Sequence, residues 1–494
     1  MKKNKTPSYV LTLKLKTEKY QEDIINKRLE IARNISNALT NKVLKRYNLM
    51  LESKEYMSIK KQLNPVNKNY HNSDNIKSKK IFEKQRKELY KQLEELYLKY
   101  DLSQYSLYND VKPMYKHFKD NIGSLESQAI ADRVWTKFDK LLHGNGNKVS
   151  FSKYNEYNSI ENKWNKINIP VIIKNDDLYA QKAIQDKVKY CRIVRKLIRG
   201  KYKYYVQMVM TGIPPIKINT ETGEVKNGIG VGNVGIDIGT RTIAFSSKNE
   251  VKLLELCPEV ENIEHKKSIL QRKLDRQRRA NNPYNYNPDG TIKRGIKLNW
   301  VKSNKYMKTQ NELRELQRKQ ADIRKQSHEK LANHILSLGN RIFVETMNFQ
   351  GLQKRAKKTT KNQQGKFNKK KRFGKSLANK APAMLIEMIN RKLKYEGLEI
   401  LKINTQKVKA SQYNHFTNEY NKKELKDRWN KDIKIQRDIY SAFLIMNVND
   451  DLESINRDKC IETYDNFKIL HDKEIQRLKE LKLQGYKLIS SMGI

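Results

Sequence analysis

Residues 231–246 read VGNVGIDIGTRTIAFS, an apolar run with one carboxylate, Asp237, near its centre. Such a run is typical of a strand in the interior of a sheet. An isolated ionised carboxylate is unfavourable there unless it becomes protonated or meets a cation. The stretch therefore predicts a buried strand, together with a partner for Asp237 supplied by another part of the chain.

The segments that follow predict the remaining elements of a mixed sheet. GNVGIDIG, TRTIAFSS and VKLLEL are expected to form three consecutive strands. A charged helical region over 259–338, broken by NNPYNYNPDGTIKRG, leads to the short strand RIFVET from 341. A helix opened by Pro382, the strand LEILKI and a helix over 433–449 follow. Three strands, helix, strand, helix, strand, helix is the element order of an RNase H-like sheet.

Three acids fall on elements that this order brings together. Asp237 lies in the first strand, Glu345 ends the fourth, and Asp438 lies on the sheet-facing side of the last helix. Two like charges ~4 Å apart repel by roughly 4 kcal/mol at an effective dielectric constant of 20, so the acids must protonate or share cations. Oxygen ligands without nearby Cys or His favour Mg²⁺ or Mn²⁺. Two such ions can activate a water and stabilise the leaving oxygen of a phosphodiester.

Each acid also has a simpler interpretation. Asp237 could be a strand-end residue, and Asp438 could cap local backbone or pair with Arg437. The actin and sugar-kinase fold is a sharper alternative, because its phosphate loop also reads Gly-Ile-Asp-x-Gly-Thr. That fold needs a second loop, Asp-x-Gly-Gly-Gly, which the sequence lacks. The conjunction of three acids in this element order favours the metal site.

The composition indicates a polyanionic partner. The 494 residues include 102 Lys and Arg against 54 Asp and Glu, a net charge of +48, and nucleic acid is the usual partner of so basic a protein. No apolar run approaches the ~18 residues of a membrane-spanning helix, so we expect no membrane partner. The N-terminus has no apolar signal core, which favours a cytoplasmic, nucleoid-associated location. The three cysteines are far apart, so neither a disulfide framework nor a cysteine-rich zinc site is expected.

The N-terminal half predicts a barrel interrupted by helices. Residues 8–16 alternate like a strand, and a long helix is expected over 18–51. After a loop at 64–75, helical patterning covers about 78–142. Strand patterns return from 145 and include a hairpin over Arg199-Gly200-Lys201. The turn-rich segment 212–229 predicts a linker to the second half.

The segment 353–375 is the most basic stretch of the chain. It holds eleven Lys or Arg and no acid, and we expect it to be mobile when unbound. The simple interpretation is a solvated loop; the functional one is that it lines a nucleic-acid channel. Its candidate nucleic-acid-binding residues are Lys354, Arg355, Lys357, Lys358, Lys369, Lys370, Lys371 and Arg372.

Several motifs along nearly the whole chain resemble the TnpB family, transposon-encoded RNA-guided RuvC-like nucleases related to compact type V CRISPR effectors. They are YVLTLKLKTE, GIDIGTR, VETMNFQGL, KLKYEGLEILKIN and QRDIYSAFLIMN. The resemblance implies that Asp237, Glu345 and Asp438 are the catalytic, metal-binding carboxylates. It also implies a prokaryotic protein with a guide RNA, a target double-stranded DNA beside a short flanking motif, and cleavage of both DNA strands.

The resemblance also implies a domain plan of mixed α+β type. A wedge-like β-barrel would comprise 1–16 and 145–228, interrupted by a helical recognition lobe over 17–144. An RNase H-like (RuvC) nuclease domain would comprise 229–404 and 433–494. The remaining segment, 405–432, occupies the position of the family's zinc finger.

The segment 405–432 departs from the family because it contains no cysteine. Bound zinc is therefore not expected, since His415 is the lone soft ligand there. We expect Tyr413, Phe416, Tyr420 and Trp429 to pack as a small apolar knot instead. Tyr440 also stands where the family typically has Asn.

The sequence therefore favours an RNA-guided, Mg²⁺- or Mn²⁺-dependent DNA endonuclease, with a monomer as the expected state. Two alternatives stay open. One is an RNA-guided repressor that binds DNA without cutting it, which the lost zinc ligands would favour. The other is a DDE-type transposase, which shares the fold and the metals but would also need a domain to read transposon ends.

Overall fold

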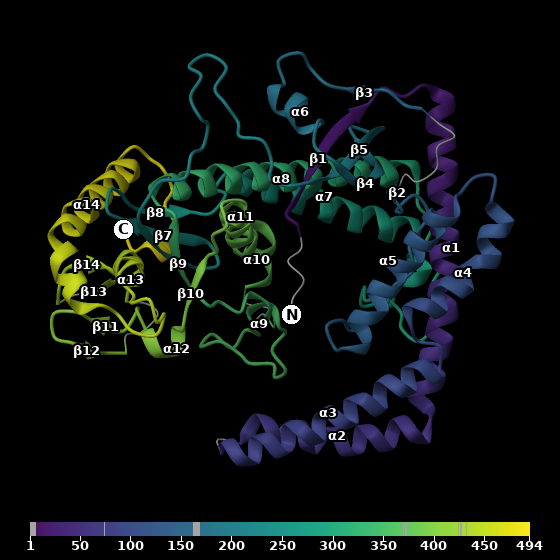
Figure 1. The fold of residues 1–494 in the computed structure, drawn as a ribbon, viewed down its shortest axis with the longest axis horizontal. Coiled ribbons are helices and arrows are strands. Elements are labelled where there is room, and N and C mark those ends of the chain that lie inside the picture. The colour runs from purple at the N-terminus through teal and green to yellow at the C-terminus, as the bar shows by residue number, and fades with distance from the viewer. Residues whose placement is uncertain are drawn as a thin grey trace. The chain divides into compact units, whose positions relative to one another are not determined.

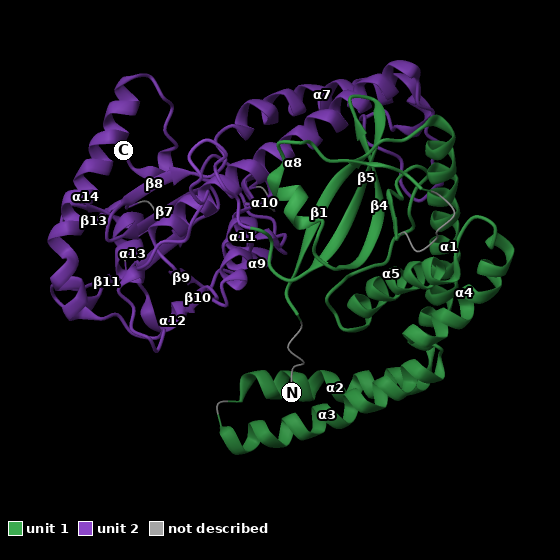
Figure 2. Ribbon diagram, turned by 45° about the horizontal axis from the view of Figure 1, so that its top comes forward, with its two compact units in different colours: residues 1–215 green, residues 216–494 purple. Residues whose placement is uncertain are grey.

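The computed structural model describes residues 6–73, 75–161, 168–368, 370, 373–422, 424, 427–430 and 432–494. The chain divides into two compact units, residues 1–215 and 216–494 (Figure 2). The division falls within the turn-rich segment 212–229. Each unit contains its own five-stranded sheet of described residues. None of the described helices is long and apolar enough to cross a membrane.

The sheet of unit 1 is antiparallel, with the order β2-β4-β5-β1-β3. Residues Arg199 and Gly200 join β4 to β5, with φ of 50° and 76°, and make the tight hairpin that the sequence predicts. No pairing among the described strands joins the edges β2 and β3, so a closed barrel stays a prediction. The strands are β1 (Ser8–Leu15), β2 (Ser159–Glu161), β3 (Val171–Ile172), β4 (Val188–Ile198) and β5 (Lys201–Thr211).

Helices form the rest of unit 1, mainly between β1 and β2 (Figure 1). The loop predicted at 64–75 is wrong over most of its length, because α2 continues to Asn72 with Pro65 inside it. Packing against α3, with Leu63 buried, outweighs the hydrogen bond that proline removes. The helices are α1 (Lys19–Glu52), α2 (Lys54–Asn72), α3 (Ile76–Lys99), α4 (Gln104–Phe118), α5 (Ser124–Leu142) and α6 (Leu178–Ala183).

The sheet of unit 2 is mixed and has the order β10-β9-β6-β7-β8. The pairs β6–β7 and β7–β8 are antiparallel, whereas β9 pairs in parallel with both β6 and β10. All five strands fall where the sequence predicts strands. They are β6 (Asn233–Ile238), β7 (Thr242–Ser247), β8 (Val251–Glu255), β9 (Arg341–Glu345) and β10 (Leu401–Ile403).

Helices cover both faces of this sheet. Ile236 and Val344 join the core that α8 and α11 share with one face, and Ala244 and Phe343 join the core that α13 and α14 share with the other. This division follows from the alternation of side chains along a strand. The helices are α7 (Val260–Asn281), α8 (Asn304–Leu338), α9 (Phe349–Gln353), α10 (Gly374–Lys380), α11 (Pro382–Tyr395), α12 (Thr405–Val408), α13 (Arg437–Met446) and α14 (Arg457–Leu483).

The last part of the chain differs from the prediction in two ways. The helix expected over 433–449 begins at Arg437, because Ile435 and Gln436 form strand β14 (Ile435–Gln436), which pairs with β13 (Trp429–Asn430). Helix α14 was not predicted at all. It packs on β8 and on α13, and so completes the layer that covers this face of the sheet.

Gly235 lets the backbone of α13 lie directly on β6. A Cβ atom at this position would overlap the carbonyl oxygen of Ala442 and the nitrogen of Met446. Any larger residue would have to push the helix away from the sheet. The contact therefore fixes the distance between β6 and α13.

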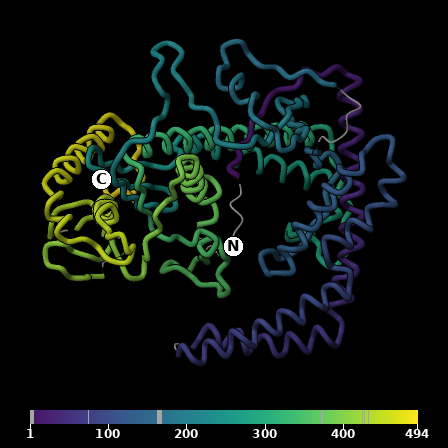
Figure 3. Tube along the Cα trace, in the orientation of Figure 1, coloured from purple at the N-terminus to yellow at the C-terminus, as the bar shows by residue number. Residues whose placement is uncertain are grey.

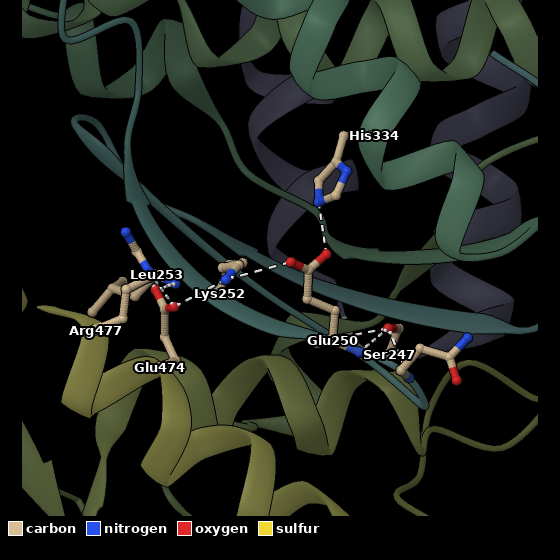
Figure 4. Close-up of polar contacts among 8 residues, drawn as sticks. Ser247, Glu250, Lys252, Leu253, His334, Glu474 and Arg477 are labelled. Atoms are coloured by element: carbon tan, nitrogen blue, oxygen red, sulfur yellow. Dashed lines mark hydrogen bonds and ion pairs between the residues drawn. The ribbon is translucent and has the colours of Figure 1, made fainter. Parts of the chain in front are cut away.

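Glu474 of α14 closes the outer edge of the sheet at β8 (Figure 4). Its carboxylate accepts a hydrogen bond from the Leu253 nitrogen at 3.0 Å and is paired with Arg477 at 2.6 Å and Lys252 at 3.3 Å. Its side chain is 1% exposed. A backbone N–H that an edge strand would otherwise leave open is thus satisfied, which blocks pairing with a further strand.

Candidate functional site

Two of the predicted acids lie at the carboxyl ends of neighbouring parallel strands. Ile236 on β6 is in register with Val344 on β9, so Asp237 and Glu345 are the next residues along the two strands. Because side chains alternate, both project to the face that α13 covers. Both are half-buried rather than sealed from solvent. The sheet therefore places two carboxylates side by side where water and a ligand can reach them.

The third acid lies in the first turn of α13. Gln436 caps this helix, since its side-chain oxygen accepts from the Ile439 nitrogen at 2.8 Å, and its own backbone N–H donates to His471 Nε2 at 3.1 Å. These bonds fix where α13 begins, above the ends of β6 and β9. Asp438 consequently faces the other two acids, and its charge is favourable at a helix N-terminus.

The three acids interact electrostatically. Burial raises the pKa of Asp237 well above its usual value, and the charges of Asp438 and Glu345 raise it further. Burial likewise raises the pKa of Glu345. Within the part of the chain that the structure describes, no hydrogen bond or ion pair joins the Asp237 or Glu345 carboxylate to another side chain. Their ionised forms therefore lack a compensating partner.

Two arginines approach Asp438, and the sequence analysis named only one of them, Arg437, as a partner. Arg437 donates through Nε and a terminal nitrogen to Asp438 Oδ1 at 3.3 and 3.1 Å, and Arg428 lies 3.7 Å from Oδ2. Both guanidinium groups partly offset the raised pKa of Asp237. Pairing of Asp438 with Arg437 was the simpler interpretation of this acid, and the contact is present. Arg437 could be predicted as a partner because it precedes Asp438 in the sequence. Arg428 could not, because only the pairing of β13 with β14 brings it close to Asp438.

The donor set fits a hard divalent cation. It consists of carboxylates from three separate elements, and two of them have no direct ion pair among the described residues. Among the described residues, no three His, Cys, Asp or Glu side chains converge closely enough to hold one metal ion. The three acids therefore interact electrostatically, but they do not form a complete metal-binding site as the side chains stand. Asp438 would have to exchange its guanidinium contacts to become a ligand.

The described residues of the basic segment 353–375, between α9 and α10, pair as a hairpin. The Ala356 nitrogen donates to the Lys370 carbonyl at 2.8 Å, and Lys361 bridges Phe367. Backbone pairing is thus present within the segment, and its mobility when unbound stays a prediction. Predicted binding residues border a cavity of about 430 Å³ in this hairpin: Lys354, Arg355, Lys358 and Lys370. Lys357 is exposed nearby. The other predicted residues, Lys369, Lys371 and Arg372, lie outside the described residues.

The cysteine-free segment 405–432 holds one short hairpin and the first strand of a second. Tyr413 and Tyr420 pair across β11 (Tyr413–Asn414) and β12 (Glu419–Tyr420), with ring centroids 4.9 Å apart. His415 is fully buried, stacks on Phe416 and shares a hydrogen bond with the Tyr440 hydroxyl at 2.6 Å. Trp429 is separate, because it packs against His471. Phe416 packs on His415 and Tyr464 rather than on the two tyrosines, so the prediction of one apolar knot of four aromatic residues is wrong.

Comparison with known proteins adds little to this geometry. No protein-family model matches the chain, and no curated protein matches its sequence. One solved structure that it resembles is the cryo-EM structure of a Cas12f1–sgRNA–target DNA complex. The match has 13% sequence identity and a TM-score of 0.39, and covers 90% of this chain and 99% of that chain. A similarity this low supports no statement about function, which has to be inferred from the residues themselves.

Proposed function

We propose that the chain is an RNA-guided DNA endonuclease that hydrolyses phosphodiesters at a single RuvC-like site in unit 2. One observation carries the proposal: Asp237, Glu345 and Asp438 face one another from β6, β9 and α13, and the first two have no direct ion pair among the described residues. A group of acids held together at such a cost is typical of a functional site. The net charge of +48 identifies a polyanion as the substrate class.

The strand order of unit 2 supports the nuclease assignment. The strand order is β8-β7-β6-β9-β10, and β7 runs opposite to the other four strands. This is the arrangement expected of an RNase H-like domain. In open sheets with parallel strands, ligands bind at the carboxyl ends of the strands. Asp237 and Glu345 occupy those ends. The candidate site is thus where the architecture favours one.

Asp237, Glu345 and Asp438 would hold two Mg²⁺ or Mn²⁺ ions. Such ions supply Lewis acidity toward a phosphodiester and lower the pKa of an attacking water. The chain's own residues set the geometry: the β6–β9 register spaces two carboxylates, and the capped start of α13 orients the third. Arg437, anchored to the Asp427 carbonyl at 3.1 Å, would have to release Asp438 when the ions bind.

The guide RNA and the DNA target are proposed on the motifs shared with the TnpB family. In such a mechanism base pairing selects the sequence, while the protein reads backbone shape and a short flanking motif. The cationic hairpin at 353–375 offers a surface for the backbone. A transposon origin and a monomeric state belong to the same proposal.

The decisive experiment uses the purified protein with any RNA that co-purifies. That RNA would be sequenced, and a plasmid carrying its complement beside a randomised flank would be incubated with the complex in Mg²⁺ or EDTA. We expect cleavage in Mg²⁺ for a subset of flanks, none in EDTA, and none for Asp237→Ala, which should still bind the plasmid. Cleavage by Asp237→Ala would refute the site. A protein that carries no discrete RNA would refute the guided mechanism.

A non-cleaving, RNA-guided repressor is the second candidate. The observation in its favour is that both Asp438 oxygens face guanidinium groups, which leaves this acid occupied. The same plasmid assay separates the two functions. A repressor would shift the plasmid with the same flank preference and leave it intact in Mg²⁺ and in Mn²⁺.

A further inference from the structure

The connection between α7 and α8, here called the arm tip (residues 282–303), is long and internally braced. The two helices run side by side, as the Cα trace shows (Figure 3). Asn282 is fully buried and bonds both the nitrogen and the carbonyl of Val301, at 2.7 and 3.0 Å. Asn285 is also buried and donates to the Asn299 carbonyl at 2.6 Å. The connection holds only a 3-10 helix, Pro283–Asn285, and one isolated bridge, and connections this long are uncommon in compact domains.

Aromatic rings lock the base of the arm tip. The guanidinium of Arg278 lies 5.3 Å from the Trp300 ring centre, and that of Arg279 lies 5.2 Å from the Tyr286 ring centre. The two rings meet edge to face at 5.9 Å. Asp275 pairs with both arginines, at 2.6 and 3.0 Å. These two arginines and two rings are therefore used inside the protein and are not available to stack on a base.

The outer surface carries cations that the protein does not use. Residues 266–308 contain thirteen Lys or Arg and two acids. Besides Lys266, eight of these cations are exposed and joined by no ion pair to an acid within the described part of the chain, whereas Arg279, which is also exposed, pairs with Asp275. The eight are Arg272, Lys273, Arg276, Arg294, Lys297, Lys302, Lys305 and Lys308. Clustered, unpaired cations on a rigid support are the electrostatic signature of a phosphate-binding surface.

Helix α14 shows that this charge is not general to unit 2. It contains seven Lys or Arg and six acids, and its charges pair locally, as in Arg477 with Glu474 and Lys468 with Asp472. Exposed lysines on α14 therefore provide a matched control for substitutions of the arm-tip cations.

We propose that the arm tip binds the sugar-phosphate backbone of a nucleic-acid duplex. Single strands are usually held by several exposed aromatic rings in succession, whereas Trp300 and Tyr286 are engaged internally. Only Tyr284 of the arm tip has a largely exposed ring, and its hydroxyl donates to Asn282 at 3.2 Å. The tip presents aliphatic side chains among its cations instead, with Ile296 and Val301 60% and 56% exposed. Such a surface suits a duplex groove bordered by phosphates. The inference extends the proposed function, but it depends only on binding and not on cleavage.

The test compares two triple charge reversals in the full chain. Arg294→Glu/Lys297→Glu/Lys302→Glu alters the arm tip, and Lys459→Glu/Lys473→Glu/Lys479→Glu makes the same charge change on exposed positions of α14. Fluorescence anisotropy in EDTA would measure affinity for a 20-bp DNA duplex, an RNA hairpin and a 20-nucleotide single strand over a range of KCl concentrations. Circular dichroism would establish that both variants are folded.

We expect the arm-tip variant to lose at least about tenfold in duplex affinity, with a log–log salt dependence shallower by about 3, one unit per lost phosphate contact. The α14 variant should change affinity less than about threefold. A loss on DNA alone or RNA alone would identify which duplex the tip binds. Equal losses for the two variants, or an equal loss on the single strand, would overturn the proposal. Because no metal is present, a protein that proved not to be a nuclease could still pass this test.

Discussion

Unit 2 contains two sets of acids on the same face of one sheet, and they differ in how their charge is compensated. Glu474, at the β8 edge, is almost fully buried and is bonded to a backbone nitrogen, an arginine and a lysine. Asp237 and Glu345, at the ends of β6 and β9, are more exposed, yet among the described residues they have no such partners. Burial alone therefore does not distinguish a structural acid from a functional one.

The difference lies in what each arrangement leaves unsatisfied. The Glu474 network is complete, so it stabilises the fold and offers nothing to a ligand. The Asp237 group is incomplete, and the raised pKa values of Asp237 and Glu345 show that their charge is disfavoured as the protein stands. A cation would remove that penalty. Substitutions at the two sites should therefore have opposite effects on stability and activity.

The largest effect is expected for Glu345→Gln. The variant keeps the shape of the side chain but removes a charge from the acid group, so cleavage should fall by roughly 1000-fold. Its free energy of unfolding should be unchanged or slightly higher, because an uncompensated carboxylate is lost. Single-turnover cleavage and urea denaturation would measure the two quantities. A large loss of stability would place Glu345 with Glu474 as a structural acid.

Glu474→Ala should show the converse pattern. The substitution leaves the Leu253 N–H and two cations without their partner, so the free energy of unfolding should fall by about 3 kcal/mol. Cleavage per folded molecule should stay close to that of the wild type. Glu480→Ala, an exposed position on the same helix, is the control and should change stability by less than about 0.5 kcal/mol. If Glu474→Ala were as stable as this control, the edge network would have no structural role.

The smallest effect is a pH-dependent gain in stability for Asp237→Asn. Because the folded state raises the pKa of Asp237, it binds more protons than the unfolded state between the ordinary Asp range and the raised value. Wild-type stability should consequently fall as pH rises through that window, relative to the variant. We expect the variant to be more stable by about 1 kcal/mol at pH 7 without metal. Thermal unfolding from pH 4 to 8 in EDTA would measure the difference, and a constant difference would contradict it.

The sequence predicts the sheet of unit 2 well because its signals are local. The strand patterns around Asp237 and Glu345, the proline that opens α11 and the positive-φ turn at Arg199-Gly200 all depend on adjacent residues. The position of Asp438 also follows from helical periodicity. These features could be predicted because no distant contact is needed to decide them.

The sequence fails where a distant contact decides the outcome. Pro65 suggests a break, but packing of α2 on α3 keeps the helix continuous. Ile435 fits the pattern of α13, yet pairing with β13 holds it in a strand. Arg428 joins the acid group only because that same pairing brings it there. Side chains delivered by short hairpins have no periodic signature, so this part of the site could not be foreseen.

The absence of a side chain at Gly235 has a consequence for how the chain can change over time. Because α13 and β6 meet there through main-chain atoms alone, a rotamer change in a neighbouring side chain does not alter the spacing of the helix and the strand that carry Asp438 and Asp237. We therefore expect that core residues around this contact can be substituted without changing the spacing of the acids. Position 235 itself accepts no larger residue unless α13 moves away from β6.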